Sequence, residues 1–270
     1  MTQISILGCG WLGFPLAKKL IENGYNVKGS TTSESKLEVL ESNQIHPFLL
    51  ELSVNKITGE ITEFLKASEI LIIDIPPKLR SVTTENFVQK IKNLIPFIEN
   101  SSVKKVIFIS STSVYGETSS NEILTEESEL HPNTESGKQL LEVENLLRNN
   151  TNFQTTIIRF GGLMGEDRNP VIHLAGKTEI ANQNKPINFI HQEDCIGIIL
   201  EIIKQDFWNE ILNAVSPFHP KRKDYYTKKA MELNLTIPHF DEKDTRSGKI
   251  ISSEKLEKVL GYSFKNLELK

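Results

Sequence analysis

Three glycines spaced closely after a short apolar run constrain this chain more than any other feature. Residues 4–7 read as a buried strand, and Gly8, Gly10 and Gly13 follow in the spacing GxGxxG, after which apolar residues recur at helical spacing. In such a turn the first glycine permits the bend, the second lets backbone approach a pyrophosphate, and the third lets helix pack on strand. Backbone N–H groups and the dipole at the helix start then hold the phosphate charge. The spacing predicts a dinucleotide-binding turn, which we favour over an ordinary glycine-capped turn.

The rest of the first 160 residues alternates short apolar runs with amphipathic stretches. Strands are predicted at residues 25–30, 48–50, 70–75, 104–110 and 155–160, and helices at 12–23, 33–42, 57–66, 84–100 and 135–149. Pro76 and Pro77 end the fourth strand, because proline cannot continue a hydrogen-bonded ladder. This alternation predicts an α/β, Rossmann-like, doubly wound parallel sheet with helices on both faces and its ligand crevice at the carboxyl ends of the strands.

The alternation loosens from Gly161 onward, where glycine, proline and asparagine cluster up to residue 186. Shorter elements follow: strands at 187–190 and 211–213, and helices at 193–204, 223–233 and 253–260. We therefore expect a dinucleotide-binding domain over residues 1–160, with a later return strand near 187–213. We also expect a small substrate-binding lobe over residues 161–270, interleaved with the dinucleotide-binding domain.

The charge, the cysteines and the apolar runs of the sequence indicate which kinds of partner and compartment this protein has. The formal net charge is −4, which argues against a nucleic-acid-binding surface, and the basic run at 221–223 reads as a solvated helix start. Cys9 and Cys195 lie far apart in apolar segments, which predicts buried free thiols in a reducing compartment. The sequence shows neither a signal peptide nor an apolar run long enough for a membrane helix. We expect a cytoplasmic protein with a small-molecule substrate and no nucleic-acid or membrane partner.

The end of the second predicted strand indicates which dinucleotide binds. An NAD-selective site usually places an acid there for the ribose hydroxyls, but no Asp or Glu occurs before Glu34. Hydroxyl groups and a lysine suit a 2′-phosphate, so NADP is favoured over NAD, although the same hydroxyls can also cap the next helix. The predicted cofactor-binding residues are Gly8, Gly10, Trp11, Leu12, Gly13, Ser30, Thr31, Thr32, Lys36 and Pro76.

Three further segments carry a family resemblance. Residues 106–116 (VIFISSTSVYG), 158–165 (IRFGGLMG) and 188–195 (NFIHQEDC) resemble, in this order, motifs of the extended short-chain dehydrogenase/reductase family. That family includes nucleotide-sugar epimerases and dehydratases. The glycine turn and residues 247–251 (SGKII) resemble more narrowly a poorly characterised bacterial branch of it. The resemblance implies a nicotinamide cofactor, and a monomer or a homodimer formed through the two long helices at 84–100 and 135–149.

Members of this family carry a serine, a tyrosine and, four residues after the tyrosine, a lysine. The lysine binds the nicotinamide ribose and lowers the tyrosine pKa, and the serine orients the substrate oxygen. Ser111 and Lys138 match two of these positions, but Thr134 stands where the tyrosine is expected. A threonine hydroxyl does not titrate near neutrality, so the standard proton transfer is left open. Tyr115 is a substitute acid or, more in keeping with its place, a packing residue at a strand end.

Other side chains are candidates for the pocket. Arg159, at the end of the sixth predicted strand, either binds substrate at the crevice or forms a structural ion pair. Arg168 suits bidentate binding of an anionic substrate. Trp11 either shields the pyrophosphate from water or fills the helix junction. His191 and Asp194 are too sparse for a metal site, and we expect them to tie the small lobe to the sheet.

Two functions of different classes remain open. The first is a reductase or epimerase-like enzyme that uses NADP on a small polar or sugar-containing substrate, with Ser111, Lys138 and Tyr115 as catalytic candidates. The second is a non-catalytic NADP-binding sensor or scaffold, which the replacement at Thr134 permits.

Overall fold

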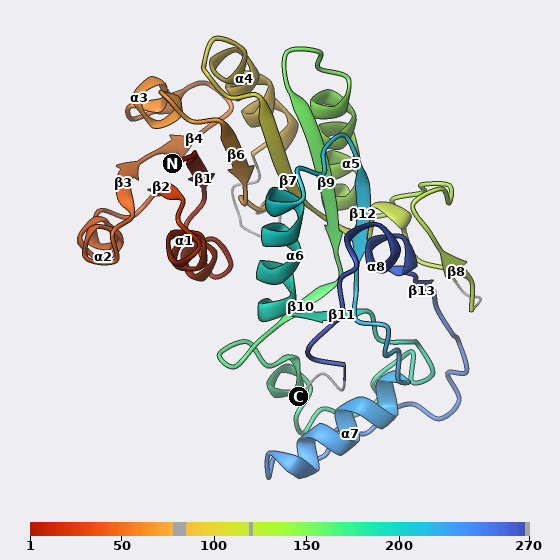
Figure 1. Ribbon diagram of the computed structural model, residues 1–270. Helices are drawn as coiled ribbons and strands as arrows, with labels where there is room; N and C mark the ends of the chain where they lie inside the picture. Colours follow the sequence, from red (N-terminus) through yellow and green to blue (C-terminus); the bar gives the residue numbers. More distant parts are fainter. Residues whose placement is uncertain (78–84, 119–120, 268–270) are drawn as a thin grey trace.

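The computed structural model describes residues 1–77, 85–118 and 121–267. Among these residues, seven parallel strands form one central sheet in the order β3-β2-β1-β6-β7-β9-β12 (Figure 1). The strands are β1 (Gln3–Leu7), β2 (Asn26–Thr31), β3 (His46–Leu49), β6 (Ile70–Ile73), β7 (Lys105–Ser111), β9 (Gln154–Phe160) and β12 (Ile211–Ala214).

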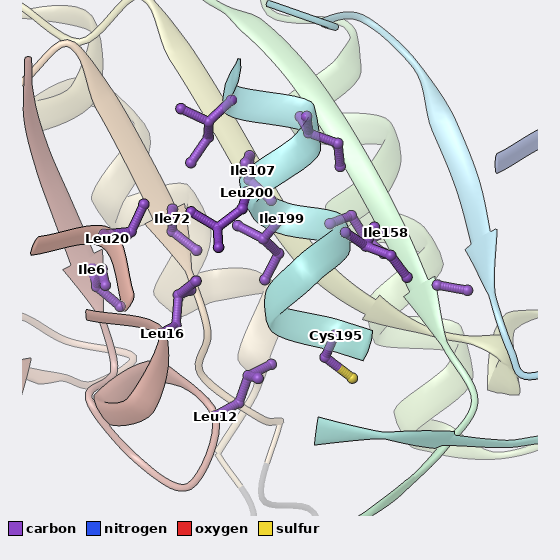
Figure 2. Close-up of a cluster of buried hydrophobic side chains, with 14 of the residues drawn as sticks. Ile6, Leu12, Leu16, Leu20, Ile72, Ile107, Ile158, Cys195, Ile199 and Leu200 are labelled. Carbon is purple, nitrogen blue, oxygen red and sulfur yellow. The ribbon is translucent and has the colours of Figure 1, made fainter. Parts of the chain in front are cut away.

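Helices cover both faces of this sheet. One apolar cluster packs α1 (Gly13–Glu22), α6 (Gln192–Lys204) and α8 (Glu254–Leu260) on one face. Figure 2 shows Leu16 and Leu20 of α1 facing Ile199 and Leu200 of α6 across this cluster. A second cluster packs α3 (Ile61–Leu65), α4 (Phe87–Glu99) and α5 (Glu135–Arg148) on the other face. The predicted Rossmann-like, doubly wound fold is confirmed.

The order of the strands determines where a ligand crevice can open. Chain order runs outward from β1 through β2 to β3, and from β6 through β7 to β9 and β12, so the direction of winding reverses between β1 and β6. Loops that leave two such strands diverge and leave a crevice at the carboxyl ends of the strands. Gly8 follows β1 and Asp74 follows β6, where the Asp74 N–H donates to the Leu7 carbonyl at 2.9 Å. The glycine turn therefore lies at the switch point.

Some predicted boundaries were wrong. Within the predicted helix 57–66, Ile57–Thr58 forms a strand, β5, that pairs antiparallel with β4 (Glu51–Leu52), and only Ile61–Leu65 is helical. Gly59, with φ +100°, separates the two parts, and two β-branched residues favour the extended form. The predicted helix 33–42 begins as a 3₁₀ turn, Glu34–Lys36, and continues as α2 (Leu37–Ser42). Helix α4 begins at Phe87, and residue 84 of its predicted range lies outside the described residues.

The later elements divide between the main sheet and a smaller cluster. Strand β12 joins the main sheet beside β9, whereas β11 (Phe189–His191) pairs with β10 (Gly162–Met164). Another short pair joins β8 (Ile123–Leu124) to β13 (Ile250–Ile251). A third apolar cluster gathers Tyr225 and Tyr226 of α7 (Arg222–Glu232) with Met164 and Phe240. The division into two domains at residue 160 stays a prediction.

Asp194 ties the C-terminal segment to the start of α6. Its buried carboxylate accepts hydrogen bonds from the Tyr262 hydroxyl at 2.9 Å and from the backbone N–H groups of Lys265 at 2.8 Å and Asn266 at 3.2 Å. His191 caps the same helix, since its Nδ1 accepts a first-turn N–H at 3.3 Å. In the described part of the chain, no helix combines the length and apolar character needed to cross a bilayer.

Replacing Asp194→Ala should lower the free energy of unfolding by about 3 kcal/mol, because three donors then lose a charged acceptor. Urea unfolding followed by circular dichroism measures this loss. The matched control is Glu193→Gln at the neighbouring exposed position, whose carboxylate accepts only the Asn266 side-chain amide among the bonds described here. It should change stability by no more than about 0.5 kcal/mol. Equal unfolding midpoints for the two variants would contradict the prediction.

Candidate functional site

A cavity of about 550 Å³ lies at the carboxyl ends of β1, β2, β6 and β7. It brings together the glycine turn, the polar end of β2, the residues after β6 and the serines at the end of β7. The predicted residues on its wall are Gly8, Gly10, Trp11, Leu12, Ser30, Thr31, Thr32, Lys36, Pro76, Ser111 and Arg168. Residues far apart in the sequence thus form one site, as the order of the strands requires.

The three glycines differ in what surrounds them. A Cβ on Gly8, whose φ is +108°, would lie 2.3 Å from the Asp74 carbonyl oxygen, and one on Gly13 would lie 2.1 Å from the Gly8 carbonyl oxygen. A Cβ on Gly10 would have nothing within 4 Å. Gly8 and Gly13 are therefore required by packing, whereas Gly10 leaves exposed backbone open on the cavity side. That is the cradle a pyrophosphate needs beside the start of a helix.

The end of β2 supports the turn. The Ser30 hydroxyl accepts the Gly8 N–H at 2.9 Å, and the Ser30 carbonyl accepts the Cys9 N–H at 2.7 Å. The Thr31 hydroxyl accepts the N–H two residues further on at 3.1 Å, which stabilises the turn into the next helix. Lys36 is exposed at the same end of the cavity. The hydroxyls of Ser30 and Thr31 thus serve local structure, at the end of the cavity where the sequence predicts a 2′-phosphate.

Asp74 is one of several residues on this wall that the sequence did not predict, together with Glu51, Lys90 and Ser110. It lines the cavity, and its carboxylate accepts the backbone N–H of Gly13. Burial raises its pKa to about 7. Burial, with Asp74 nearby, also raises the pKa of the Cys9 thiol to about 12, so this thiol stays protonated. The available signal was an acid directly after the apolar run 70–73, at the end of a strand that pairs with β1.

Ser111 ends β7 on the cavity wall. Its Oγ accepts the Ser113 N–H at 3.2 Å and so caps the 3₁₀ turn Thr112–Tyr115. This bond fixes the position of the hydroxyl oxygen while the hydroxyl proton stays able to donate. The neighbouring Ser110 also lines the cavity, and its hydroxyl donates to the Glu144 carboxylate at 2.5 Å.

Arg159 and Tyr115 do not line the cavity. The Arg159 side chain is 2% exposed, and its guanidinium donates to Glu144, with Nη2 at 2.7 Å from Oε2, and to the Tyr115 hydroxyl at 2.9 Å. That hydroxyl donates to the Asn213 side-chain oxygen at 2.8 Å, and burial raises the pKa of Tyr115. Of the two roles left open for Arg159, the structure shows the structural ion pair, in which its nitrogens are occupied, and a substrate-binding role stays a prediction. Tyr115 packs at the strand end.

Position 134 serves the helix that follows it. Thr134 is the N-cap of α5, and its Oγ1 accepts the Gly137 N–H at 3.1 Å. Thr134 and Lys138 are both exposed, and neither is among the described residues on the cavity wall. The structure therefore does not bring Lys138 and Ser111 onto one wall, and the ribose-binding role of Lys138 stays a prediction.

Trp11 and Arg168 stack beside the glycine turn. The guanidinium carbon of Arg168 lies 5.0 Å from the centroid of the Trp11 ring. The indole N–H donates to Asp167 at 2.7 Å, and the Gln192 amide donates to the Trp11 carbonyl at 2.7 Å. These contacts hold a cation and an aromatic ring at the mouth of the turn. Trp11 therefore has the position needed to cover a pyrophosphate.

Comparison with known proteins agrees with this geometry. A family described as NAD(P)H-binding matches residues 8–205, which include the glycine turn, the described cavity wall except Leu7, and α6. The chain belongs to this NAD(P)H-binding family. Protein YeeZ of Escherichia coli K12 is 31% identical over 266 residues, which cover 98% of this chain and 96% of that protein.

Solved structures show the same fold. UDP-glucuronic acid 4-epimerase from Bacillus cereus in complex with NAD superposes with a TM-score of 0.80 at 18% identity, covering 98% of this chain and 92% of that one. MoeE5 in complex with UDP-glucuronic acid and NAD gives 0.79 at 17% identity, covering 98% and 94%. The fold resemblance to NAD-dependent epimerases, first drawn from the sequence motifs, is confirmed.

The glycine contacts separate a folding role from a binding role. Gly10→Ala should change the free energy of unfolding by no more than about 0.5 kcal/mol, because its Cβ meets open space. It should weaken NADPH binding about tenfold, since the methyl group enters the cradle. Gly13→Ala should instead cost about 3 kcal/mol of stability, because its Cβ meets backbone. Thermal unfolding and NADPH titration by tryptophan fluorescence measure both effects, and equal stability of the two variants would contradict the assignment.

Proposed function

We propose that this chain binds NADP in the cavity and acts as an oxidoreductase or epimerase-like enzyme on a small polar or sugar-containing substrate. One observation carries the proposal: a single cavity is lined by Lys36 beyond the glycine turn and by Ser111 at the end of β7. A dinucleotide is long enough to extend from Lys36 to Ser111 within such a cavity. The cytoplasm is the location that we propose.

Each part of the cavity has a proposed task. The backbone at Gly8 and Gly10 binds the pyrophosphate, and Lys36 with the hydroxyl groups of Thr31 and Thr32 binds the 2′-phosphate. The nicotinamide supplies or accepts a hydride when it is bound. Ser111 orients the substrate oxygen by donating its hydroxyl proton to it.

The substrate class rests on the relatives and on charge. The Bacillus cereus relative is a UDP-glucuronic acid 4-epimerase, and MoeE5 was solved with UDP-glucuronic acid. In this chain Arg168 supplies a cation on the cavity wall, held in place by its stacking on Trp11. An anionic sugar derivative suits such a wall, because a guanidinium binds carboxylates and phosphates in a bidentate manner.

A second candidate is a non-catalytic NADP-binding sensor or scaffold. The observation in its favour is the role of Thr134, whose hydroxyl is used as a helix cap where the family has its proton-transferring tyrosine. Either function is compatible with a monomer or a homodimer. For the dimer we propose an interface on α4 and α5. An ion pair of 3.2 Å between Lys92 and Glu142 joins these two helices. Phe97 on α4 has 39% of its surface exposed and would be covered there.

The wild-type protein should bind NADPH more tightly than NADH. Lys36→Ala should lower NADPH affinity about tenfold, the loss expected of one charge-assisted phosphate contact, and change NADH affinity less than about twofold. The matched control is Lys66→Ala, which removes an exposed lysine that does not line the cavity. Fluorescence titration gives all affinities. Tighter binding of NADH than of NADPH would overturn the NADP assignment.

A catalytic role for Ser111 can be tested apart from cofactor binding. With nucleotide-sugar substrates, Ser111→Ala should lower kcat/KM about 100-fold or more and leave the Kd for NADPH unchanged, because the hydroxyl contacts substrate. Ser113→Ala, which keeps the backbone N–H that Ser111 accepts, is the control.

Thr134→Tyr distinguishes the enzyme from the sensor. Turnover that occurs only in Thr134→Tyr would favour the non-catalytic alternative, and full activity of Ser111→Ala would remove the catalytic assignment.

A further inference from the structure

The glycine turn holds a carboxyl group on the wall of the proposed pyrophosphate site. Asp74 follows β6 at the switch point of the sheet, lines the cavity, and accepts the backbone N–H of Gly13, the first residue of α1. Its Oδ2 lies 3.1 Å from the point that a Cβ on Gly13 would occupy. A negative charge at this place lies beside the backbone that Gly10 leaves open for a phosphate.

Among the residues that the structure describes, the groups around Asp74 do not compensate such a charge. The thiols of Cys9 in the turn and Cys195 on α6 lie within electrostatic reach of Asp74, and its negative charge contributes to the raised pKa of each. The other charged residues on this cavity wall, in the part of the chain that the structure describes, are Lys36, Glu51, Lys90 and Arg168. Among the described residues no cation lowers the pKa of Asp74, since burial and the Gly13 N–H are the influences on it. Lys90 instead pairs with Glu85 at 2.5 Å, and Arg168 stacks on Trp11.

We propose that Asp74 is a cofactor-binding residue that contacts the dinucleotide as a neutral carboxylic acid, so that binding takes up one proton from solvent. This rests on the proposed function, since it requires that the cavity bind a dinucleotide. One O–H bond forms on the carboxyl group, and the proton comes from the buffer. The neutral acid keeps one oxygen to accept the Gly13 N–H and gains a donor that can reach a phosphate oxygen or a ribose hydroxyl.

The direction of the pH dependence follows from charge. The free protein holds Asp74 with a pKa of about 7, and a bound pyrophosphate raises it further because like charges oppose ionisation. Below this pKa the group is already protonated, so affinity is greatest and does not depend on pH. Above it each binding event must take up a proton, so the affinity falls as the pH rises, by at most tenfold per pH unit.

The experiment measures proton uptake directly. Isothermal titration calorimetry of the full chain with NADPH at pH 8 is repeated in buffers of different ionisation enthalpy, since the 2′-phosphate is already ionised at that pH. We expect nearly one proton taken up per NADPH, and a Kd that rises several-fold to tenfold between pH 7.5 and 8.5. Asp74→Asn, which keeps an oxygen for the Gly13 N–H, should abolish both effects and bind NADPH more tightly than wild type at pH 8.5. Its thermal unfolding verifies that it is folded.

A matched control and two other outcomes make the test decisive. Glu51→Gln neutralises an exposed carboxylate at the other end of the cavity and should keep the wild-type proton uptake. Tight NADPH binding with no proton uptake at pH 8, or an unchanged pH dependence in Asp74→Asn, would overturn this inference and leave the proposed function standing. No binding of NADPH or NADH by wild type between pH 6 and 9 would overturn both.

Discussion

The contact between the end of β1 and the start of α1 is the constraint on which the site depends. Gly13 lies so close to the Gly8 carbonyl that a Cβ would come within 2.1 Å of it. Because β1 pairs with both β2 and β6, the same turn receives Ser30 from one neighbour and Asp74 from the other. Three strand ends are thereby fixed at one point. The cavity exists because this point is also where the winding of the sheet reverses.

At the glycine turn, the groups available to bind an anion are backbone N–H donors more than cationic side chains. The open backbone at Gly10 and the start of α1 provide N–H donors. The cations on the cavity wall include Lys36, and also Arg168, which stacks on Trp11. A site of this kind binds a phosphate through fixed dipoles, so a half-buried carboxyl group on the same cavity wall has a large effect on it. Asp74 is tolerated there because burial favours its neutral form.

The sequence predicts local structure well and long-range partners poorly. The glycine spacing and the alternation of apolar runs predicted the parallel sheet, the position of its crevice and the part of the cavity wall next to the glycine turn, because these depend on neighbouring residues. The strand at Ile57–Thr58 was missed because two residues are too few to show a period. The partner of Arg159 is Glu144 on α5, and only the packing of that helix on the sheet brings them together. Asp74 was missed because its importance comes from the pairing of β6 with β1.

Position 134 carries a helix cap where the family resemblance leads one to expect a tyrosine. A threonine caps a helix because its short hydroxyl reaches back to a first-turn N–H, a bond that a tyrosine hydroxyl at the same position cannot make. The hydroxyl of Thr134 therefore stabilises α5, and this exposed residue is not among the described residues on the cavity wall. Among the described residues of the cavity wall, two groups have strongly raised pKa values. Between the two wall residues with strongly raised pKa values, Cys9 at about 12 stays a thiol, whereas Asp74 at about 7 exchanges a proton near neutral pH.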